Sequence, residues 1–188
     1  DQKQVVGFGF LSDSPSVTRG YRLRLGLGGQ NELVLLEIDP VPLLAQTTSN
    51  GADRINDLGH VVGFAYSGEG GPTGTNLYRG FLWKGPFTDP IEMRTLTGGN
   101  TLANGLNDSD AVVGTSIIPG SNDGEAALWE HDAQGAQTGT LLGTQIPSKP
   151  SWYLGSAWDI NNDGWIGGYG RKFVKGKYTW TGLLLVPN

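Results

Sequence analysis

Short apolar runs separated by polar, glycine-rich segments make up most of this 188-residue chain. The runs are rich in β-branched and aromatic residues, and each is bounded by Gly, Pro, Asn, Asp or Ser. This pattern is typical of short β-strands joined by turns. Because no segment keeps an apolar period of about 3.6 residues, we predict no helix longer than a single turn. The pattern therefore predicts an all-β fold.

The apolar runs recur in a fixed order. Successive copies of a Val-Val-Gly phrase lie 56, 51 and 54 residues apart and end at Gly7, Gly63, Gly114 and Gly168. A second phrase, a small residue followed by large apolar ones, keeps step at residues 19–23, 79–83, 125–129 and 181–185. A recurring unit of this length indicates a propeller, a solenoid or another repeat array. We predict one repeat domain, residues 1–188, with units at approximately 1–44, 45–98, 99–147 and 148–188.

Each full unit is expected to contain four strands, named a to d. Strand a ends in an Ile-Asn or Leu-Asn pair, strand b is the Val-Val-Gly phrase, and strand c is the second apolar phrase. Strand d is expected at residues 32–38, 91–96 and 138–143. The first unit lacks strand a and the last lacks strand d, which leaves fourteen strands in total.

The junction between strands a and b reads Asn-Asp-x-Gly or a close variant. Asn and Asp side chains bond back to nearby backbone amides, and the fourth residue can adopt positive φ, which is the chemistry of a tight hairpin. We therefore predict positive φ at Gly59, Asp110 and Gly164. The aligned residue of the first unit is Lys3, where the chain begins midway through the turn.

Strands b and c are expected to form the surface on which sheets stack. Alternation places Val61 and Val62 on opposite faces, and because both are apolar the sheet should be covered on each side. The neighbouring glycines leave room for a bulky group, for which Trp83 and Trp129 are candidates. Small sheets packed face to face in series describe a β-propeller, so we predict a small β-propeller built from four repeats of about 50 residues of short antiparallel strands.

The two incomplete end units allow two arrangements. A four-bladed ring would close if residues 4–10 paired with the C-terminal segment. The alternative is an open array, or a ring completed by another chain. Closure is the preferred prediction, because exposed sheet edges otherwise invite pairing between molecules.

Composition narrows the classes of function. The net charge is −5, and the densest basic stretch, residues 171–177, holds only four cations, so nucleic-acid binding is not expected. No apolar run approaches the ~20 residues of a membrane helix. The absence of cysteine excludes disulfides, zinc–thiolate sites and cysteine nucleophiles. The chain has no initiator Met and no signal-like N-terminus, which indicates a processed or trimmed product.

The recurring residues resemble those of a known family. The order Ile-Asn-Asp-x-Gly-x-Val-Val-Gly, then Gly-Phe-Leu-Trp, then Leu-x-x-Leu is similar to the bacterial HAF-repeat proteins, most closely over residues 45–130. Phe81 stands at the aromatic position of the family, and Arg79 and Gly80 stand where the family often has His-Ala. The first unit departs most from the pattern of the family, because it has Lys3 at the turn position.

The resemblance implies export and repeated β-structure, and hence an extracellular or cell-surface protein. The ending at residues 181–188 looks like the last repeat of members that continue into a C-terminal sorting segment. The family has no established activity, so no catalytic residues are carried over from it.

Candidate metal chemistry is confined to one loop. Asp159, Asn161 and Asp163 match the first half of a calcium loop, in which alternate oxygens converge on a hard cation. The position of the bidentate Glu that completes such a loop is Gly170, and the aligned repeats lack two of the carboxylates. An ordinary hairpin turn is the preferred interpretation and calcium the alternative. We predict no metal and no cofactor.

Catalytic candidates are equally sparse. His60 and His131 are the only histidines, and the sequence places no Ser or Asp to complete a triad with either. The acidic residues at positions 89, 92, 108 and 110 are expected to be solvated surface groups. No catalytic residue is therefore predicted.

Aromatic residues are the strongest binding candidates. Four of them fall within residues 152–165, behind a segment bounded by prolines. Such rings could stack on sugar faces, with nearby Asn and Asp supplying hydrogen bonds, or pack between sheets, which is the preferred role for Trp158. Two further tyrosines flank a long glycine-rich loop. The predicted binding residues are Trp152, Tyr153, Trp165, Tyr66 and Tyr78.

These observations predict an exported, non-enzymatic binding or scaffold module that recognises a glycan or a protein partner through propeller loops. The first alternative is a structural subunit of a larger extracellular assembly, joined through open sheet edges. The second alternative is a glycan hydrolase or lyase with a spatially assembled site.

Overall fold

The structure is a computed structural model that describes most of the chain. The described residues are 3–11, 14–25, 32–36, 47–67, 77–85, 88–132, 135–146 and 151–187. They form two compact units, residues 1–92 and residues 93–188. Each unit holds two antiparallel sheets, so the predicted all-β fold is confirmed.

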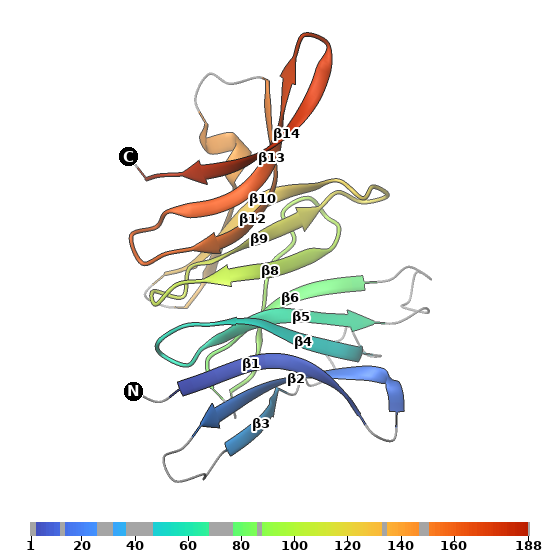
Figure 1. Cartoon of the computed structure of the whole chain (residues 1–188), viewed down its shortest axis with the longest axis vertical. Helices are drawn as coiled ribbons and strands as arrows, with labels where there is room; N and C mark the ends of the chain where they lie inside the picture. The colour runs from blue at the N-terminus through green and yellow to red at the C-terminus, as the bar shows by residue number, and fades with distance from the viewer. Residues whose placement is uncertain are drawn as a thin grey trace. The chain divides into compact units, whose positions relative to one another are not determined.

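The first unit contains a three-stranded and a four-stranded sheet (Figure 1). Consecutive strands are hydrogen-bonded neighbours, so both sheets are meanders. The first sheet consists of β1 (Lys3–Leu11), β2 (Ser14–Leu25) and β3 (Glu32–Leu36). The second consists of β4 (Thr47–Ile55), β5 (Val61–Ser67), β6 (Leu77–Trp83) and β7 (Ile91–Glu92).

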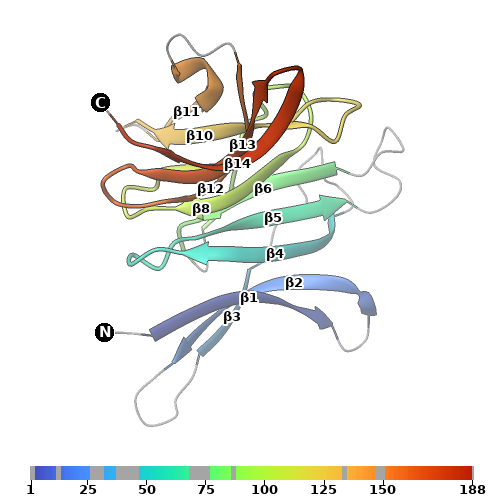
Figure 2. The same ribbon diagram turned by 45° about the horizontal axis from the view of Figure 1, so that its top comes forward.

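The second unit repeats this construction in the opposite order, with four strands and then three (Figure 2). Its first sheet consists of β8 (Thr101–Leu106), β9 (Val112–Ile117), β10 (Gly124–His131) and β11 (Gln137–Leu141). The second consists of β12 (Trp152–Ile160), β13 (Ile166–Val174) and β14 (Lys177–Leu185). A single 3-10 turn, η3 (Leu142–Gln145), is the only helical element of the described residues, as the absence of a helical period predicts.

The described residues contain the fourteen strands that were expected, and one of these strands is much shorter than expected. The strand expected at residues 91–96 is reduced to the two residues of β7. Beyond it, the Arg94 amide donates to Gln137 Oε1 at 2.7 Å, and the Leu96 amide donates to Ser116 Oγ at 3.1 Å. Side chains of the second unit therefore accept hydrogen bonds from amides that could otherwise extend the β6–β7 ladder.

The hairpins between strands a and b have the predicted conformation. Gly59, Asp110 and Gly164 have φ of 82°, 62° and 79°, which confirms positive φ at all three positions. In each loop the Asn side-chain oxygen accepts hydrogen bonds from two amides, two and four residues ahead. The chain therefore closes each turn with its own side chain. Lys3, the aligned residue of the first unit, is the first residue of β1.

The strands preceding these hairpins each carry a β-bulge at the same aligned position. The extra residue is Asp53 in β4, Asn104 in β8 and Trp158 in β12. A bulge bends its strand and increases the local twist, which re-aims the side chain of the extra residue. Asn104 uses this direction to donate from Nδ2 to the Ala157 carbonyl of the next sheet at 2.8 Å.

In three of the four Val-Val-Gly phrases the glycine lies against a neighbouring backbone, and in the first phrase Gly7 lies against the Tyr21 side chain; none lies against a tryptophan. A Cβ added to Gly63, Gly114 or Gly168 would lie 2.0, 1.9 or 2.3 Å from a carbonyl oxygen of the adjacent strand. The expectation that Trp83 or Trp129 fills this space is therefore wrong. Trp129 is instead fully buried and donates from Nε1 to the Arg94 carbonyl.

Each unit has its own apolar core. In the first unit, Val61, Phe81 and Trp83 pack with Ala52 and Ala65. Val61 and Val62 are both buried, as expected for a strand covered on each face. In the second unit, Val113, Leu154 and Ile166 pack with Ala126 and other residues of both sheets.

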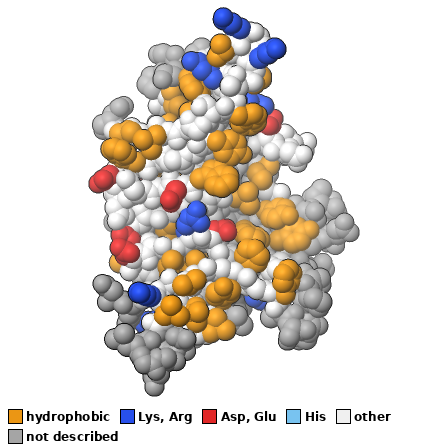
Figure 3. Space-filling model, viewed as in Figure 1, with side chains coloured by type: hydrophobic (Ala, Val, Ile, Leu, Met, Phe, Trp, Pro, Cys, Tyr) orange, Lys and Arg blue, Asp and Glu red, His pale blue; other side chains and the backbone are white. Residues whose placement is uncertain are grey.

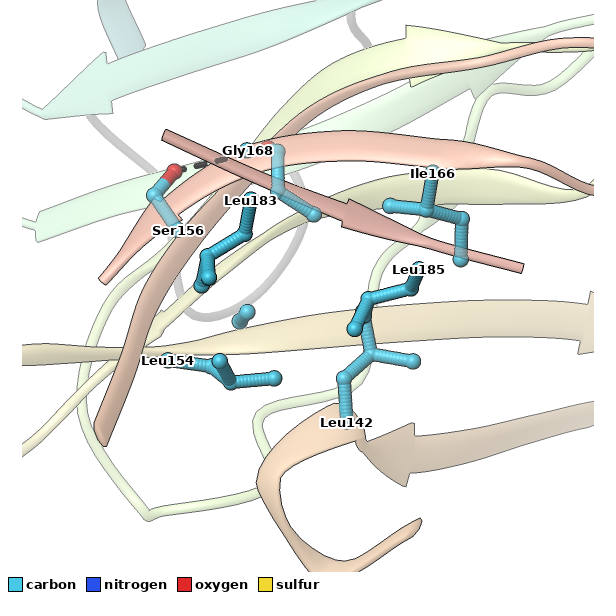
Figure 4. A pocket seen from close by; sticks show the side chains of 9 residues that line it. Leu142, Leu154, Ser156, Ile166, Gly168, Leu183 and Leu185 are labelled. Atoms are coloured by element: carbon cyan, nitrogen blue, oxygen red, sulfur yellow. Dashed lines mark hydrogen bonds between the residues drawn. The ribbon is translucent and has the colours of Figure 1, made fainter. Parts of the chain in front are cut away.

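The space left within the second core is small. Figure 4 shows Leu154, Ile166 and Leu183 converging on it from β12, β13 and β14. Its volume of about 10 Å³ is no larger than the room one water molecule needs. This cavity is therefore part of a packed core and is not a ligand site.

The closing pair between the N-terminal and C-terminal strands stays a prediction. β1 is an edge strand hydrogen-bonded to β2, and β14 is an edge strand hydrogen-bonded to β13. β2 pairs along nearly the whole length of β1, which uses the amides and carbonyls at one edge of β1.

Candidate functional site

One face of the sheet β12–β13–β14 is covered with exposed aromatic side chains. Ladder partners share a face, so Arg171 lies beside Tyr153 and Trp180, and Phe173 lies beside Tyr178. Figure 3 shows apolar side chains gathered over this sheet, next to the Lys and Arg side chains of the β13–β14 end. We call this surface the aromatic face and define it as Tyr153, Trp158, Tyr169, Arg171, Phe173, Tyr178 and Trp180.

The rings of the aromatic face form a row across the three strands. Trp158 of β12 and Tyr169 of β13 have ring centroids 6.2 Å apart, and Tyr169 and Trp180 of β14 have centroids 5.4 Å apart. These separations are typical of interacting aromatic pairs. Trp158 is 56% exposed and Trp180 is 57% exposed. The rings therefore support one another and still present large areas to solvent.

Glycines leave gaps between the rings. Gly182 pairs with Tyr169 and Gly167 pairs with Leu184, all on this face. A Cβ added to Gly167 or Gly182 would meet no atom within 4 Å. The floor of the face is therefore bare backbone, which a ligand can approach closely.

Arg171 is held in place by the surrounding rings. Its Cζ lies 4.5 Å from the centroid of Tyr153 and 4.7 Å from that of Tyr178, within the range of cation–π attraction. Nη2 lies 3.5 Å from Asp123 Oδ2. Tyr153 is fixed in turn, because its hydroxyl donates to the Gly124 carbonyl at 2.8 Å. Burial, then Asp123 and Glu125, raise the pKa of Tyr153, so its hydroxyl stays protonated as a donor.

The structure brings only one of the five predicted binding residues, Tyr153, onto this face. Trp152 lies on the opposite face of β12, where the Lys172 ammonium is 5.2 Å from its ring. Trp165 lies in the hairpin between β12 and β13 and is 45% exposed. The preferred core role of Trp158 is wrong, because the bulge in β12 turns its ring toward solvent.

The two remaining candidates, Tyr66 and Tyr78, lie in the first unit. They occupy β5 and β6 rather than the loop between them, and they are ladder partners. Their ring centroids are 4.7 Å apart. Each ring therefore stacks on the other. The loop itself, residues 68–76, lies outside the described residues.

Several residues of the aromatic face were not predicted. Tyr169, Arg171 and Phe173 alternate along β13, and Tyr178 and Trp180 alternate along β14. This period of two was a usable signal, since it places all five on one side of a hairpin. The sequence does not show, however, which side of the hairpin remains uncovered.

The calcium alternative has little support in the hairpin of residues 161–164. Asn161 Oδ1 accepts hydrogen bonds from the Asp163 and Trp165 amides, and Asp159 Oδ1 accepts one from the Ile160 amide. These oxygens are directed at the backbone of the turn. Within the part of the chain that the structure describes, no group of three or more His, Cys, Asp or Glu side chains could hold a metal ion.

Neither of the two histidines is a residue of the aromatic face. His60 lies between the β4–β5 turn and the first residue of β5, and its amide donates to Asn56 Oδ1. His131 ends β10, where it pairs with Gln137. Asp53 has a raised pKa, because burial disfavours its charge more strongly than Arg54 favours it. A lone carboxyl with a raised pKa does not make an acid–base pair.

Asp53 nevertheless makes stability depend on pH. Its folded-state pKa lies above the ordinary value of 3.8, so its stabilising contribution is complete below pH 3.8 and is lost as the pH rises through the folded-state pKa. We expect Asp53→Asn, which introduces the amide found at the aligned Asn104, to be more stable than the parent at pH 7 and equal to it near pH 3.5. Urea unfolding at a series of pH values measures this. A stability difference that is the same at every pH would contradict it.

The chain was compared with protein-family models and with curated proteins. No protein-family model matches the chain, and no curated protein matches it. In the described residues, no helix is both long enough and apolar enough to cross a membrane.

Proposed function

We propose that this protein is an exported, non-enzymatic binding module, and that the aromatic face is where it recognises a glycan. The observation that carries the proposal is the exposed row of Trp158, Tyr169 and Trp180. Soluble proteins do not leave such rings in a contiguous exposed patch without a partner. Aromatic side chains combine a large apolar area with few rotatable bonds, so they bind flat apolar surfaces with little loss of entropy.

The proposal includes the repeat architecture and the family expected from the sequence. Each of the four sheets lies within one of the expected repeat units, which supports a stack of small blades related to the HAF-repeat proteins. A closed propeller would cover both faces of every sheet. Binding through the aromatic face therefore requires the open form of the array.

The glycan proposal is tested by removing rings from the aromatic face. We expect Tyr169→Ala and Trp180→Ala each to weaken retention of the protein on glycans about five- to thirtyfold, since one stacked ring contributes about 1–2 kcal/mol. A glycan array identifies the retained sugars, and titration calorimetry with the best of them measures affinity.

Trp152→Ala is the matched control, because it removes a tryptophan from the opposite face of the same sheet. Its affinity should equal that of the parent. The proposal fails if no glycan binds at millimolar concentration, or if Trp152→Ala abolishes binding while Trp180→Ala preserves it. Circular dichroism on all variants checks that the fold is retained.

A second candidate function, assembly into an extracellular structure, is favoured by exposed apolar residues on the first sheet. Val5 is 45% exposed and Leu33 is 62% exposed, and both pair with Leu23 on one face. Faces of this kind can stack against another copy. A native mass above 20.0 kDa for the samples used on the array would favour this candidate.

A further inference from the structure

We infer that the aromatic face takes an acidic polysaccharide, one whose sugar rings bear carboxylate groups. This inference rests on the proposed function, because it specifies the class of glycan bound by the same face. It is carried by a cluster of cations beside the rings. We call this cluster the basic hairpin and define it as Arg171, Lys172, Lys175 and Lys177.

Charge is distributed very unevenly along the chain. Residues 164–188 contain the four cations of the basic hairpin and neither Asp nor Glu, so this segment carries +4. The whole chain carries −5, which leaves −9 on residues 1–163. A polyanion is therefore attracted to the β13–β14 end and repelled by the remainder of the surface.

The turn holds the cations at the tip of the hairpin. Lys175 and Gly176 have φ of 49° and 80°, the signature of a two-residue turn that matches the twist of the strands. Lys172, Lys175 and Lys177 are all exposed. Positive charge therefore lies at the end of the aromatic face that is nearest the β13–β14 turn.

Arg171 brings charge onto the aromatic face itself. Tyr153, Tyr178 and Trp180 surround its guanidinium, which fixes the plane of the group. Its Nε is buried and has no hydrogen-bond partner among the described residues. Asp123 contacts only Nη2, and Glu125 lies near Tyr153. The Arg171 side chain is 25% exposed, so its fixed guanidinium presents positive charge beside the rings, which suits a carboxylate.

Exposed rings and cations together favour one class of anionic partner over the others. The turn of the hairpin is Val-Lys-Gly-Lys, with Val174 43% exposed and Phe173 and Tyr178 behind it. The two lysines at this turn would lose water if the hairpin entered the apolar part of a membrane interface, which disfavours that partner. Nucleic-acid binding surfaces belong to basic domains, whereas this chain has a pI of about 4.9. A uronic-acid polymer offers both flat ring faces and regularly placed carboxylates.

The test compares two polymers that differ only in charge. Polygalacturonate and the fully methyl-esterified form of the same polymer are titrated into the full chain. We expect the charged polymer to bind about tenfold more tightly, and added salt to reduce that difference, because exposed ionic contacts are screened. Lys175→Gln with Lys177→Gln should weaken polygalacturonate binding about tenfold and leave the methyl ester unaffected.

Lys3→Gln with Arg54→Gln is the matched control, since it removes two exposed cations of the first unit and gives the same net charge of −7. It should bind polygalacturonate as the parent does. Equal binding of both polymers, lost in Trp180→Ala, would overturn the acidic class and leave the glycan proposal intact. Binding of neither polymer, while neutral glycans are retained, would overturn it as well. Retention on anionic phosphatidylglycerol vesicles without binding to polygalacturonate would instead indicate a membrane surface.

Discussion

Gly114→Ala is expected to destabilise the second unit by about 3–4 kcal/mol, at the upper end of the effects of single substitutions. The added Cβ would lie 1.9 Å from the Leu102 carbonyl oxygen. That oxygen belongs to the backbone of β8, so it cannot move away as a side chain would. Relief requires β8 and β9 to separate at the point where Gly114 pairs with Ala103. Urea denaturation followed by tryptophan fluorescence measures the loss.

The matched controls for this substitution lie side by side in β13. Gly168 is the aligned glycine, and its added Cβ would lie 2.3 Å from the Ser156 carbonyl oxygen. Gly167 precedes it, and its added Cβ would meet no atom within 4 Å. Gly168→Ala should therefore be strongly destabilising, and Gly167→Ala should change stability by no more than about 0.5 kcal/mol. Equal effects of the two substitutions would show that strand propensity, not the close approach of backbones, governs these positions.

Asn107→Ala is expected to cost about 2–4 kcal/mol, because one buried side chain serves two purposes. Its Oδ1 accepts hydrogen bonds from the Ser109 and Ala111 amides, which closes the β8–β9 turn. Its Nδ2 donates to the Asn161 carbonyl at 3.2 Å, which links this turn to the turn of the next sheet. Alanine would leave the buried Ala111 amide without its partner, and would remove the partner of the Ser109 amide and the Asn161 carbonyl as well. Thermal and urea unfolding both report the loss.

Asn161→Ala removes the side chain that closes a turn but keeps the backbone carbonyl that links the two turns. Asn161 Oδ1 closes its own turn through the Asp163 and Trp165 amides, but its side chain is exposed. We expect this substitution to cost about 1 kcal/mol, as for the loss of exposed turn hydrogen bonds. If Asn107→Ala and Asn161→Ala cost the same, the link between the two turns adds nothing to stability.

The hairpins were predictable because their chemistry is local. Asn56, Asn107 and Asn161 each bond to amides within four residues, and the residue with positive φ follows within three. Nothing distant in the sequence is needed to form such a loop. The strands on either side follow from the same local rules, so the all-β fold and the fourteen strands could be read from the chain.

The predictions that were wrong depend on contacts between residues that are far apart in the sequence. The strand expected at residues 91–96 is cut short by Ser116 and Gln137, which bind its amides from across the second unit. The interpretation of the glycines failed because a carbonyl oxygen next to a β-bulge in the adjacent strand, a feature with no clear sequence signal, lies against Gly63, Gly114 and Gly168.

The candidate site was located only in part for a similar reason. Trp152 and Tyr153 are adjacent in the sequence and lie on opposite faces of β12. Trp158 was expected in the core, and the bulge at its position exposes it. Alternation shows which side chains share a face, whereas exposure depends on which face another sheet covers.

The meander order of the sheets has a consequence for how such a chain can change in length. Among the described residues, every hydrogen-bonded ladder joins strands that are consecutive in the sequence, and no ladder runs from one sheet into another. A duplication or loss of one sheet therefore breaks no strand pairing, and its cost is confined to the side-chain contacts at the new junction. Closing each hairpin also needs only a short loop, so the entropy of forming a sheet does not grow as more sheets are added. In this architecture the number of repeats can vary in evolution more freely than the sequence of any one repeat.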